Sequence, residues 1–337
     1  MMPFLSESRR PTGRRRIHLR VHLALSALVG IATLVGAAQP VTPRSVAVTF
    51  DDLPAPRVAV VSNTPSGLRE NTARLLGALE AHGVAAVGFV NEGKLVVPGE
   101  DLAARAARTD VLRMWLDAGM ELGNHTYSHP DLNTTPLADF EEDLVRGEPT
   151  LVGLLSGRGQ TLRYFRHPFL HVGLDLEKRQ AFERFLAERG YTVAPVTVDN
   201  DDYIYAALYA KAMRRGDTEL AGRIAADYLR YMESVFEFVE GVSQRLAGRE
   251  IPQVLLLHAN AVNADTFGRL AEMLKRRGYG FVTLEKALAD DAYRLPDTYV
   301  GKWGISWLHH WEQAAGLKRS PSPNPPDWIM SAFKELQ

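Results

Sequence analysis

Apolar, β-branched runs alternate along the chain with longer stretches of helical periodicity. The helical stretch at 66–83, for example, begins at a candidate Ser66 cap and ends at Gly83. The runs that predict strands span residues 45–50, 85–90, 120–125, 161–166, 191–198, 253–258 and 279–284. Strands that alternate with helices are parallel and joined by crossovers, so the pattern predicts an α/β fold with either an open sheet or a (β/α) barrel.

Ionisable residues end five of the predicted strands. They are the pair Asp51 and Asp52, then His125, Arg166, Asp199 and His258. The carboxyl ends of parallel strands gather on one face of an α/β fold, which is where barrel active sites are built. One such residue is commonplace, but their repetition at the same relative position predicts a site on that face.

Two pairs of these polar residues raise the question of a metal ion. His125 and His129 lie four residues apart, so they point the same way on a helix, whereas in a polar loop both rings would face water. The adjacent Asp51 and Asp52 would repel each other if buried, unless they only form a turn before Pro54. A cation held by Asp52, His125 and His129 resolves this repulsion and leaves the neighbouring carboxylate free as a base. Such a ligand set favours Zn²⁺ and also accepts Co²⁺, Ni²⁺ or Fe²⁺.

Composition narrows the kinds of site that the chain can build. None of the 337 residues is cysteine, which excludes disulfides, thiolate zinc sites, cysteine nucleophiles and a lipidated cysteine. Any metal site must therefore use histidines and carboxylates. Lys and Arg together number 39 against 40 Asp and Glu, so no net positive field argues for a nucleic-acid partner.

The N-terminus has the pattern of an export signal. Several arginines before residue 21 precede an apolar run at 23–38 that ends in small residues, which predicts a signal peptide over residues 1–38. The apolar run is shorter than the roughly 20 residues of a membrane span. We therefore expect a periplasmic or secreted protein with no membrane span after cleavage, with an uncleaved membrane anchor as the alternative.

Five short motifs together point to a known family. They are TFDD, HTYSHP, RHPF, VDNDDY and LLLH, in this order. In order and approximate spacing they resemble the motifs of the polysaccharide deacetylase family, also called the NodB-homology domain or carbohydrate esterase family 4. The resemblance covers residues 43–290 and implies a distorted (β/α) barrel of the NodB-homology type.

The resemblance also implies a metal-dependent active site. It agrees with Asp52, His125 and His129 as the ligands of a divalent metal ion, with zinc the first choice. It gives Asp51 as the catalytic base and Arg166 as the residue that pairs with and orients this base. Without the family, a surface salt bridge is the alternative for Arg166.

A general acid and an oxyanion donor are implied in the same way. His258 matches the acid that protonates the departing amine, with Asp199 as the partner that tunes it. The backbone N–H of Phe169, which follows Pro168, matches the oxyanion donor. Without the family, His258 is typical of a hydrogen-bonded core histidine, and residues 199–202 are typical of a solvated turn.

The chain departs from the family in its third and fourth motifs and in one long connection. Phe169 stands where tyrosine is usual, and Tyr203 stands where tryptophan is usual. Residues 203–252 form a predicted helical insertion where typical members have a much shorter connection. We expect its tyrosines in the core, with a place over the substrate cleft as the alternative. They are Tyr203, Tyr205, Tyr209, Tyr228 and Tyr231.

The C-terminal segment, residues 291–337, lies beyond the resemblance. Trp303, Trp307 and Trp311 recur every four residues and predict one helical stripe packed against the barrel, with a sugar platform as the alternative. His309 and His310 are expected at the surface. The Pro-rich stretch at 320–328 is expected to be loosely ordered.

These expectations combine into a function. We expect a deacetylase that hydrolyses N-acetyl, or alternatively O-acetyl, groups of an acetylated carbohydrate in the cell envelope or outside the cell. One alternative is a metal-dependent hydrolase of a small non-sugar amide, and another is a catalytically silent glycan-binding protein. The sequence leaves the oligomeric state open.

Overall fold

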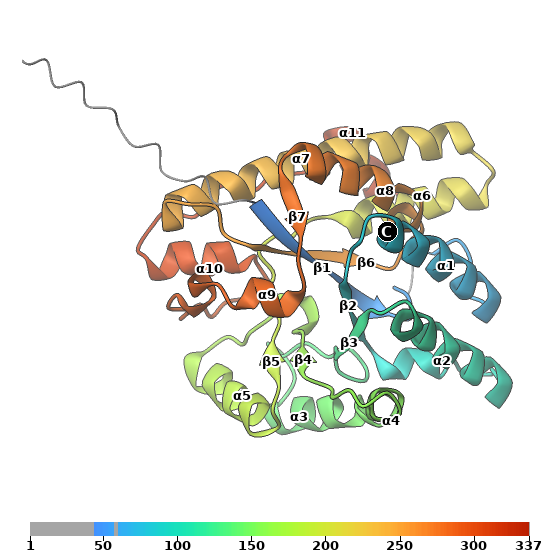
Figure 1. The fold of residues 1–337 in the computed structure, drawn as a ribbon, viewed down its shortest axis with the longest axis horizontal. Helices are drawn as coiled ribbons and strands as arrows, with labels where there is room; N and C mark the ends of the chain where they lie inside the picture. The colour runs from blue at the N-terminus through green and yellow to red at the C-terminus, as the bar shows by residue number, and fades with distance from the viewer. Residues whose placement is uncertain (1–43, 57–59, 337) are drawn as a thin grey trace, which may run out of the picture. The chain divides into compact units, whose positions relative to one another are not determined.

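The computed structural model describes residues 44–56 and 60–336, in which a single parallel sheet lies among helices (Figure 1). Its strands are β1 (Arg44–Leu53), β2 (Ala86–Val90), β3 (Glu121–Asn124), β4 (Tyr164–Phe165), β5 (Thr192–Val193), β6 (Gln253–His258) and β7 (Tyr279–Phe281). They are joined in the order β5-β4-β3-β2-β1-β6, and β7 pairs with β1. A parallel bridge between Val198 and Leu255 links the segment after β5 to β6, so the two edges of the sheet meet. The distorted (β/α) barrel expected from the sequence is therefore confirmed.

The helices follow the alternation seen in the sequence. They are α1 (Pro65–Ala81), α2 (Leu102–Asp117), α3 (Leu137–Arg146), α4 (Pro149–Ser156), α5 (Leu176–Glu188), α6 (Asp202–Arg214), α7 (Thr218–Ala247), α8 (Ala261–Arg276), α9 (Leu284–Leu288), α10 (Trp307–Ala314) and α11 (Asp327–Lys334), with short 3₁₀ turns η1 (Glu92–Leu95), η2 (Pro168–Leu170) and η3 (Asp291–Arg294). Helix α1 is capped by Thr64, whose side chain accepts from Gly67 N–H, and not by Ser66 as predicted. No helix among the described residues is long and apolar enough to cross a membrane. The predicted signal peptide, residues 1–38, lies outside the described residues.

The core forms around β1, whose alternate side chains point to opposite sides of the sheet. Val46, Val48 and Phe50 are buried in the main apolar cluster, and Ala47 is buried in a second cluster. The Phe50 ring lies 5.3 Å from that of Trp115 in α2 and 6.3 Å from that of Phe267 in α8. Phe50 of β1 therefore packs against aromatic rings from both α2 and α8.

The register of the strands brings the predicted site residues together. β1 and β6 run in parallel with Asp51 opposite His258. β3 and β4 run in parallel with Asn124 opposite Phe165, so the next residues, His125 and Arg166, leave the sheet side by side. These strand ends lie on the carboxyl face of the sheet, where we expected the site.

Helices α6 and α7 occupy the residues predicted as a helical insertion. Tyr205, Tyr209, Tyr228 and Tyr231 are buried there, which confirms the expectation that these tyrosines pack in the core. Tyr203 differs, because 48% of its surface is exposed. Figure 1 shows the long α7 running beside α8 and α6.

The C-terminal segment packs more closely than the sequence suggests. Trp307 and Trp311 are buried as predicted, but Trp303 precedes α10 and remains 65% exposed, so the predicted stripe is wrong at this position. The surface prediction for His309 and His310 is also wrong. Both side chains are buried, and each has a hydrogen-bond partner there. His309 Nε2 lies 3.1 Å from the Ser320 carbonyl oxygen, and His310 Nδ1 lies 3.0 Å from an Asp297 carboxylate oxygen.

Candidate active site

The two motif histidines converge through a tight loop and not through a helix. Thr126 and His129 both have positive φ angles, 66° and 62°. The turn is held by Thr126 N–H, which donates to Asn124 Oδ1, and by His129 N–H, which donates to Thr126 Oγ1. The condition that we attached to the histidine spacing, a helical backbone, is therefore not met, yet the rings lie 4.8 Å apart.

Asp52 completes a set of three candidate metal ligands with these histidines. Its Oδ1 atom lies 3.7 Å from His129 Nε2 and 4.0 Å from His125 Nε2. Ligands about 2.0–2.1 Å from a tetrahedral zinc ion lie roughly 3.4 Å from one another. Small side-chain adjustments would therefore bring these three atoms to coordination distance of one ion. The residues thus fit the divalent metal ion that the family resemblance implies.

Hydrogen bonding and burial prepare the histidines to act as neutral ligands. His125 Nδ1 lies 2.8 Å from the Arg166 carbonyl oxygen, so Nδ1 carries the proton and the Nε2 lone pair faces Asp52. Burial lowers the pKa of His125 well below its usual range, and it also lowers the pKa of His129. Two neutral imidazoles and a carboxylate are donors that zinc accepts.

Asp52 is kept ionised by a lysine from the neighbouring strand end. Burial opposes ionisation, but the charge of Lys94, whose Nζ lies 2.7 Å from Asp52 Oδ1, and those of the nearby histidines together outweigh this effect, and the Asp52 pKa falls below its usual range. The lysine belongs to η1, directly after β2. Sequence reasoning missed Lys94, because nothing in its local pattern sets it apart from a surface lysine.

Asp51 is paired with a fully buried arginine, as the resemblance implied. Arg166 Nη1 lies 3.4 Å from Asp51, while Arg166 Nε donates to the Ala194 carbonyl and Nη2 donates to Thr49 Oγ1. These bonds fix the guanidinium and rule out the alternative of a surface salt bridge. Burial raises the pKa of the Asp51 carboxyl to about 6, although the charges of Arg166 and His258 oppose the rise.

His258 has an aspartate partner, but a different one from the predicted Asp199. Asp202 Oδ1 lies 2.7 Å from His258 Nδ1, and Asp202 Oδ2 accepts from the His258 backbone N–H at 2.9 Å. Burial by itself would lower the pKa of His258, but the charge and hydrogen bond of Asp202, with smaller contributions from the charges of Asp52 and Asp51, raise it to about 9. The prediction for Asp199 is therefore wrong, because Asp202, the first residue of α6, faces the end of β6.

Asp199 instead lies in the wall of the cleft, next to Asn200. Burial, together with the nearby charge of Asp201, raises the pKa of Asp199 to about 7. The cleft is lined by the predicted site residues, by the exposed aromatic residue Tyr203 and by Gly304 from the C-terminal segment. The alternative that insertion tyrosines line the cleft thus holds for Tyr203.

Phe169 lies at the rim of the same cleft, in η2 after Pro168. Its φ angle is 57°, and its half-exposed ring lies 4.4 Å from the His129 ring. Among the described residues no backbone hydrogen bond uses the Phe169 N–H, so this donor is available to a ligand. The Phe169 carbonyl lies so close to Gly304 that a Cβ atom there would be 1.8 Å from the oxygen, which explains why a glycine follows Trp303.

Comparison with known proteins points to the family that the motifs resemble. Residues 38–184 match the polysaccharide deacetylase family model. The chain is 27% identical over 176 residues to a chitin deacetylase from Pestalotiopsis sp, which covers 52% of this chain and 48% of that protein. It is 24% identical over 247 residues to a probable peptidoglycan-N-acetylglucosamine deacetylase from Arthroderma benhamiae, covering 73% of this chain and 44% of that protein. The chain thus spans about half the length of the curated relatives it matches.

One solved structure is also similar to this chain, at a lower sequence identity than the two curated relatives. The family 4 carbohydrate esterase from Streptomyces lividans, in complex with acetate, is 23% identical with a TM-score of 0.44, over 72% of this chain and 95% of that chain. The family-model match over residues 38–184 thus agrees with the resemblance of the ordered motifs to the polysaccharide deacetylase family.

Proposed function

We propose that this protein is a metal-dependent deacetylase that hydrolyses N-acetyl groups of an envelope or extracellular glycan. The observation that carries the proposal is the position of one base and one acid around the candidate metal ligands. Asp51, held by Arg166, lies 3.8 Å from the ligand histidine His125. His258, held by Asp202, borders the same cleft.

The metal would be bound by Asp52, His125 and His129. When bound there, a divalent ion supplies a Lewis acid that polarises the acetyl carbonyl and lowers the pKa of water. Zinc is the ion that this donor set favours, and cobalt, nickel or iron are accepted alternatives.

The remaining residues divide the proton transfers between them. Asp51 accepts a proton from the attacking water, and the Arg166 guanidinium keeps the carboxylate in place. His258 is protonated at neutral pH, so it can donate its proton to the departing amine nitrogen. Phe169 lines the cleft, and its backbone N–H would donate to the oxygen on which negative charge develops.

The proposed substrate is supported by the names of the relatives, and the proposed location by the predicted leader. The two curated relatives are named for chitin and for N-acetylglucosamine of peptidoglycan, so we propose an acetylated amino-sugar polymer or oligomer as the substrate. Export through the signal peptide predicted at residues 1–38 would bring the enzyme to such glycans. O-acetyl groups on the same class of carbohydrate would use the same machinery.

The variant Asp51→Asn separates an enzyme from a catalytically silent glycan-binding protein. In an enzyme, this variant binds the oligosaccharide but releases acetate about 10²–10⁴-fold more slowly, the usual contribution of a general base. The measurement is acetate release from an N-acetylglucosamine oligomer alongside the oligomer's dissociation constant. If the parent and Asp51→Asn both bind the oligomer but release negligible acetate, the protein is a catalytically silent glycan-binding protein. If the parent hydrolyses small non-sugar amides but not the oligomer, the result would support the alternative of a metal-dependent hydrolase of a small amide.

A further inference from the structure

The helical insertion reaches the residue that holds the proposed general acid. Asp202, the partner of His258, is the first residue of α6, and α6 packs against α7. Tyr228 and Tyr231 of α7 lie three residues apart, so their side chains point to the same face of that helix. Tyr205, in the first turn of α6, packs against both, with its ring 5.4 Å from each of theirs. This face of α7 therefore lies against the helix start that carries Asp202.

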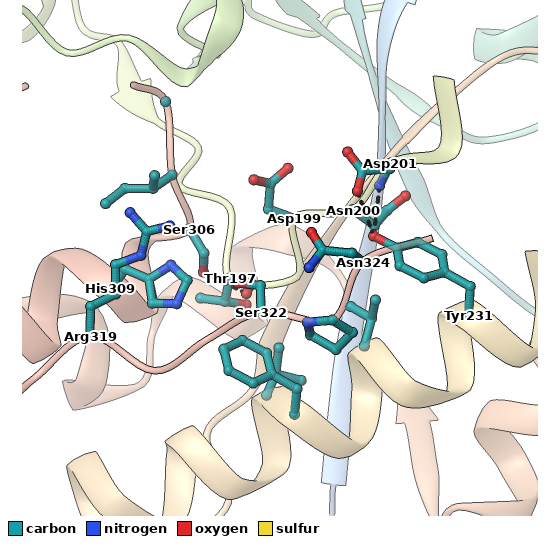
Figure 2. A pocket seen from close by; sticks show the side chains of 16 residues that line it. Thr197, Asp199, Asn200, Asp201, Tyr231, Ser306, His309, Arg319, Ser322 and Asn324 are labelled. Atoms are coloured by element: carbon teal, nitrogen blue, oxygen red, sulfur yellow. Dashed lines mark hydrogen bonds between the residues drawn. The ribbon is translucent and has the colours of Figure 1, made fainter. Parts of the chain in front are cut away.

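Tyr231 fixes the residue directly before Asp202. Its hydroxyl accepts from the Asp201 N–H and donates to Asp201 Oδ2, each at 3.1 Å (Figure 2). The Asp202 N–H in turn donates to Asn200 Oδ1 at 3.1 Å. The backbone that carries Asp202 is therefore held both by α7 and by the preceding loop.

Asn263 of α8 bridges the Asp202 carboxylate and the backbone of His258. Its Nδ2 group donates to Asp202 Oδ2 at 2.7 Å and to the His258 carbonyl oxygen at 2.9 Å. A carboxylate and a carbonyl can only accept hydrogen bonds, so the amide must face them with its NH₂ group. The reversed amide would bring three oxygens together with no hydrogen between them. Asp202 therefore depends on the orientation of the Asn263 amide for one of its donors.

Tyr228 of α7 sets that orientation. Its hydroxyl donates to Asn263 Oδ1 at 2.7 Å, and both side chains are fully buried. Burial, together with the charge of Asp202, raises the pKa of Tyr228 well above its usual range, so the hydroxyl keeps the proton that it donates. Without this donor, Asn263 Oδ1 would be a buried acceptor with no other partner among the described residues, which is costly. A chain of hydrogen bonds thus runs from α7 through Asn263 and Asp202 to His258.

We propose that Asn263 and Tyr228 are positioning residues that hold the Asp202 carboxylate against His258. The helical insertion is then part of the catalytic centre and not only a cover for it. His258 borders the cleft, and because its Nδ1 faces Asp202, its Nε2 is the nitrogen that can protonate a leaving amine. The direction of Nε2 depends on how firmly Asp202 is held, and a misdirected acid donates its proton poorly. This inference rests on the proposed function, to which it adds two residues and a role for α7.

Three single variants separate positioning from packing. Tyr228→Phe removes only the hydroxyl, and Asn263→Leu removes the amide at similar volume. Tyr205→Phe is the matched control, because it also removes a tyrosine hydroxyl of the insertion, but one that donates to Asp227 outside the chain to His258. Tyr228→Phe keeps the ring and its packing, so it carries the test if Asn263→Leu does not fold.

The first measurement follows the His258 ring by proton nuclear magnetic resonance, without substrate. Its Nδ1–H faces Asp202 at 2.7 Å, so the parent should show a slowly exchanging downfield resonance for this proton. We expect exchange with solvent to be about tenfold faster in Tyr228→Phe, the effect of one hydrogen bond, at least as fast in Asn263→Leu, and unchanged in Tyr205→Phe. Exchange that is equal in all four proteins, or equally faster in Tyr205→Phe, would overturn the proposal. So would the absence of the slowly exchanging proton from the parent.

The second measurement compares two leaving groups. The amine of an N-acetylglucosamine oligomer must gain a proton as the C–N bond breaks, whereas the nitrophenolate of para-nitrophenyl acetate leaves without one. Tyr228→Phe and Asn263→Leu should lower kcat on the oligomer about tenfold with KM unchanged, and should change hydrolysis of the aryl ester by less than about twofold. Equal losses on both substrates would contradict the proposal, because they would reflect a general loosening of the site.

Proton exchange needs no turnover, so it separates this proposal from the proposed function. If the parent releases no acetate but exchange depends on Tyr228 and Asn263, the positioning chain stands and the deacetylase function fails. If acetate is released while exchange is the same in every variant, the function stands and the positioning role fails.

Discussion

Asp202→Asn tests whether a buried carboxylate holds His258 in its protonated, acid form. Asp202 Oδ1 faces His258 Nδ1 at 2.7 Å, and Oδ2 accepts from the His258 N–H and from the side-chain amides of Asn260 and Asn263. In the variant, the amide oxygen keeps the side with three donors, so the amide NH₂ faces His258. Nδ1 must then accept a hydrogen bond, which only the neutral imidazole can do.

The size of the effect follows from the position of the pKa. Burial alone lowers the pKa of His258, and Asp202, with smaller contributions from the charges of Asp52 and Asp51, raises it to about 9. Without the Asp202 charge the pKa of His258 should fall toward the ordinary value of about 6.5. At pH 7.5 the protonated fraction of His258 would then drop from about 97% toward about 10%.

Two assays follow the change. Nuclear magnetic resonance titration of the His258 ring should give a pKa near 9 in the parent and below 7 in Asp202→Asn. The alkaline limb of kcat/KM should move down by the same amount, because the protonated acid is lost as pH rises through its pKa. Asp201→Asn is the matched control, since Asp201 bonds Tyr231 instead. An unshifted His258 titration in Asp202→Asn would refute the reasoning.

Two other side chains around the candidate metal ligands give predictions of their own. Lys94→Met should raise the affinity for zinc by about tenfold or more, because the ammonium 2.7 Å from Asp52 Oδ1 no longer competes with the ion for that oxygen. Lys94→Arg is the charge-preserving control in a competition titration with a chelating dye, and weaker binding by Lys94→Met would contradict the prediction. Arg166→Met should lower the free energy of unfolding by about 3–5 kcal/mol, since it leaves Asp51 buried without its partner. Denaturant unfolding at pH 8 measures this, and a loss under 1 kcal/mol would show that the pair is not needed for stability.

The sheet and the candidate metal ligands could be predicted from the sequence because both depend on local patterns. Strand runs alternate with helical ones, and the polar residues lie at strand ends, Asp52 near the end of β1 and His125 directly after β3. Parallel pairing then brings strand ends together whatever the details of the loops. The histidine pair was found by its spacing, although the backbone reaches that geometry through positive φ angles at Thr126 and His129.

The partner of His258 could not be chosen from the sequence. Three aspartates lie within four residues, and only the start of α6 decides that Asp202, not Asp199, turns toward β6. His309 and His310 were placed wrongly for a related reason. Their partners, Ser320 and Asp297, are contributed by loops on either side of α10, and such contacts leave no periodic signal.

Acetate release that depends on metal tests the central claim most directly. The purified protein is freed of metal with a chelator, assayed on an N-acetylglucosamine oligomer, and assayed again after one equivalent of zinc is added. The account predicts no release from the metal-free protein, release restored by zinc, and no restoration in His129→Ala, which lacks one ligand. Release that persists after the metal is shown to be gone, or that is absent when zinc is shown to be bound, would contradict it.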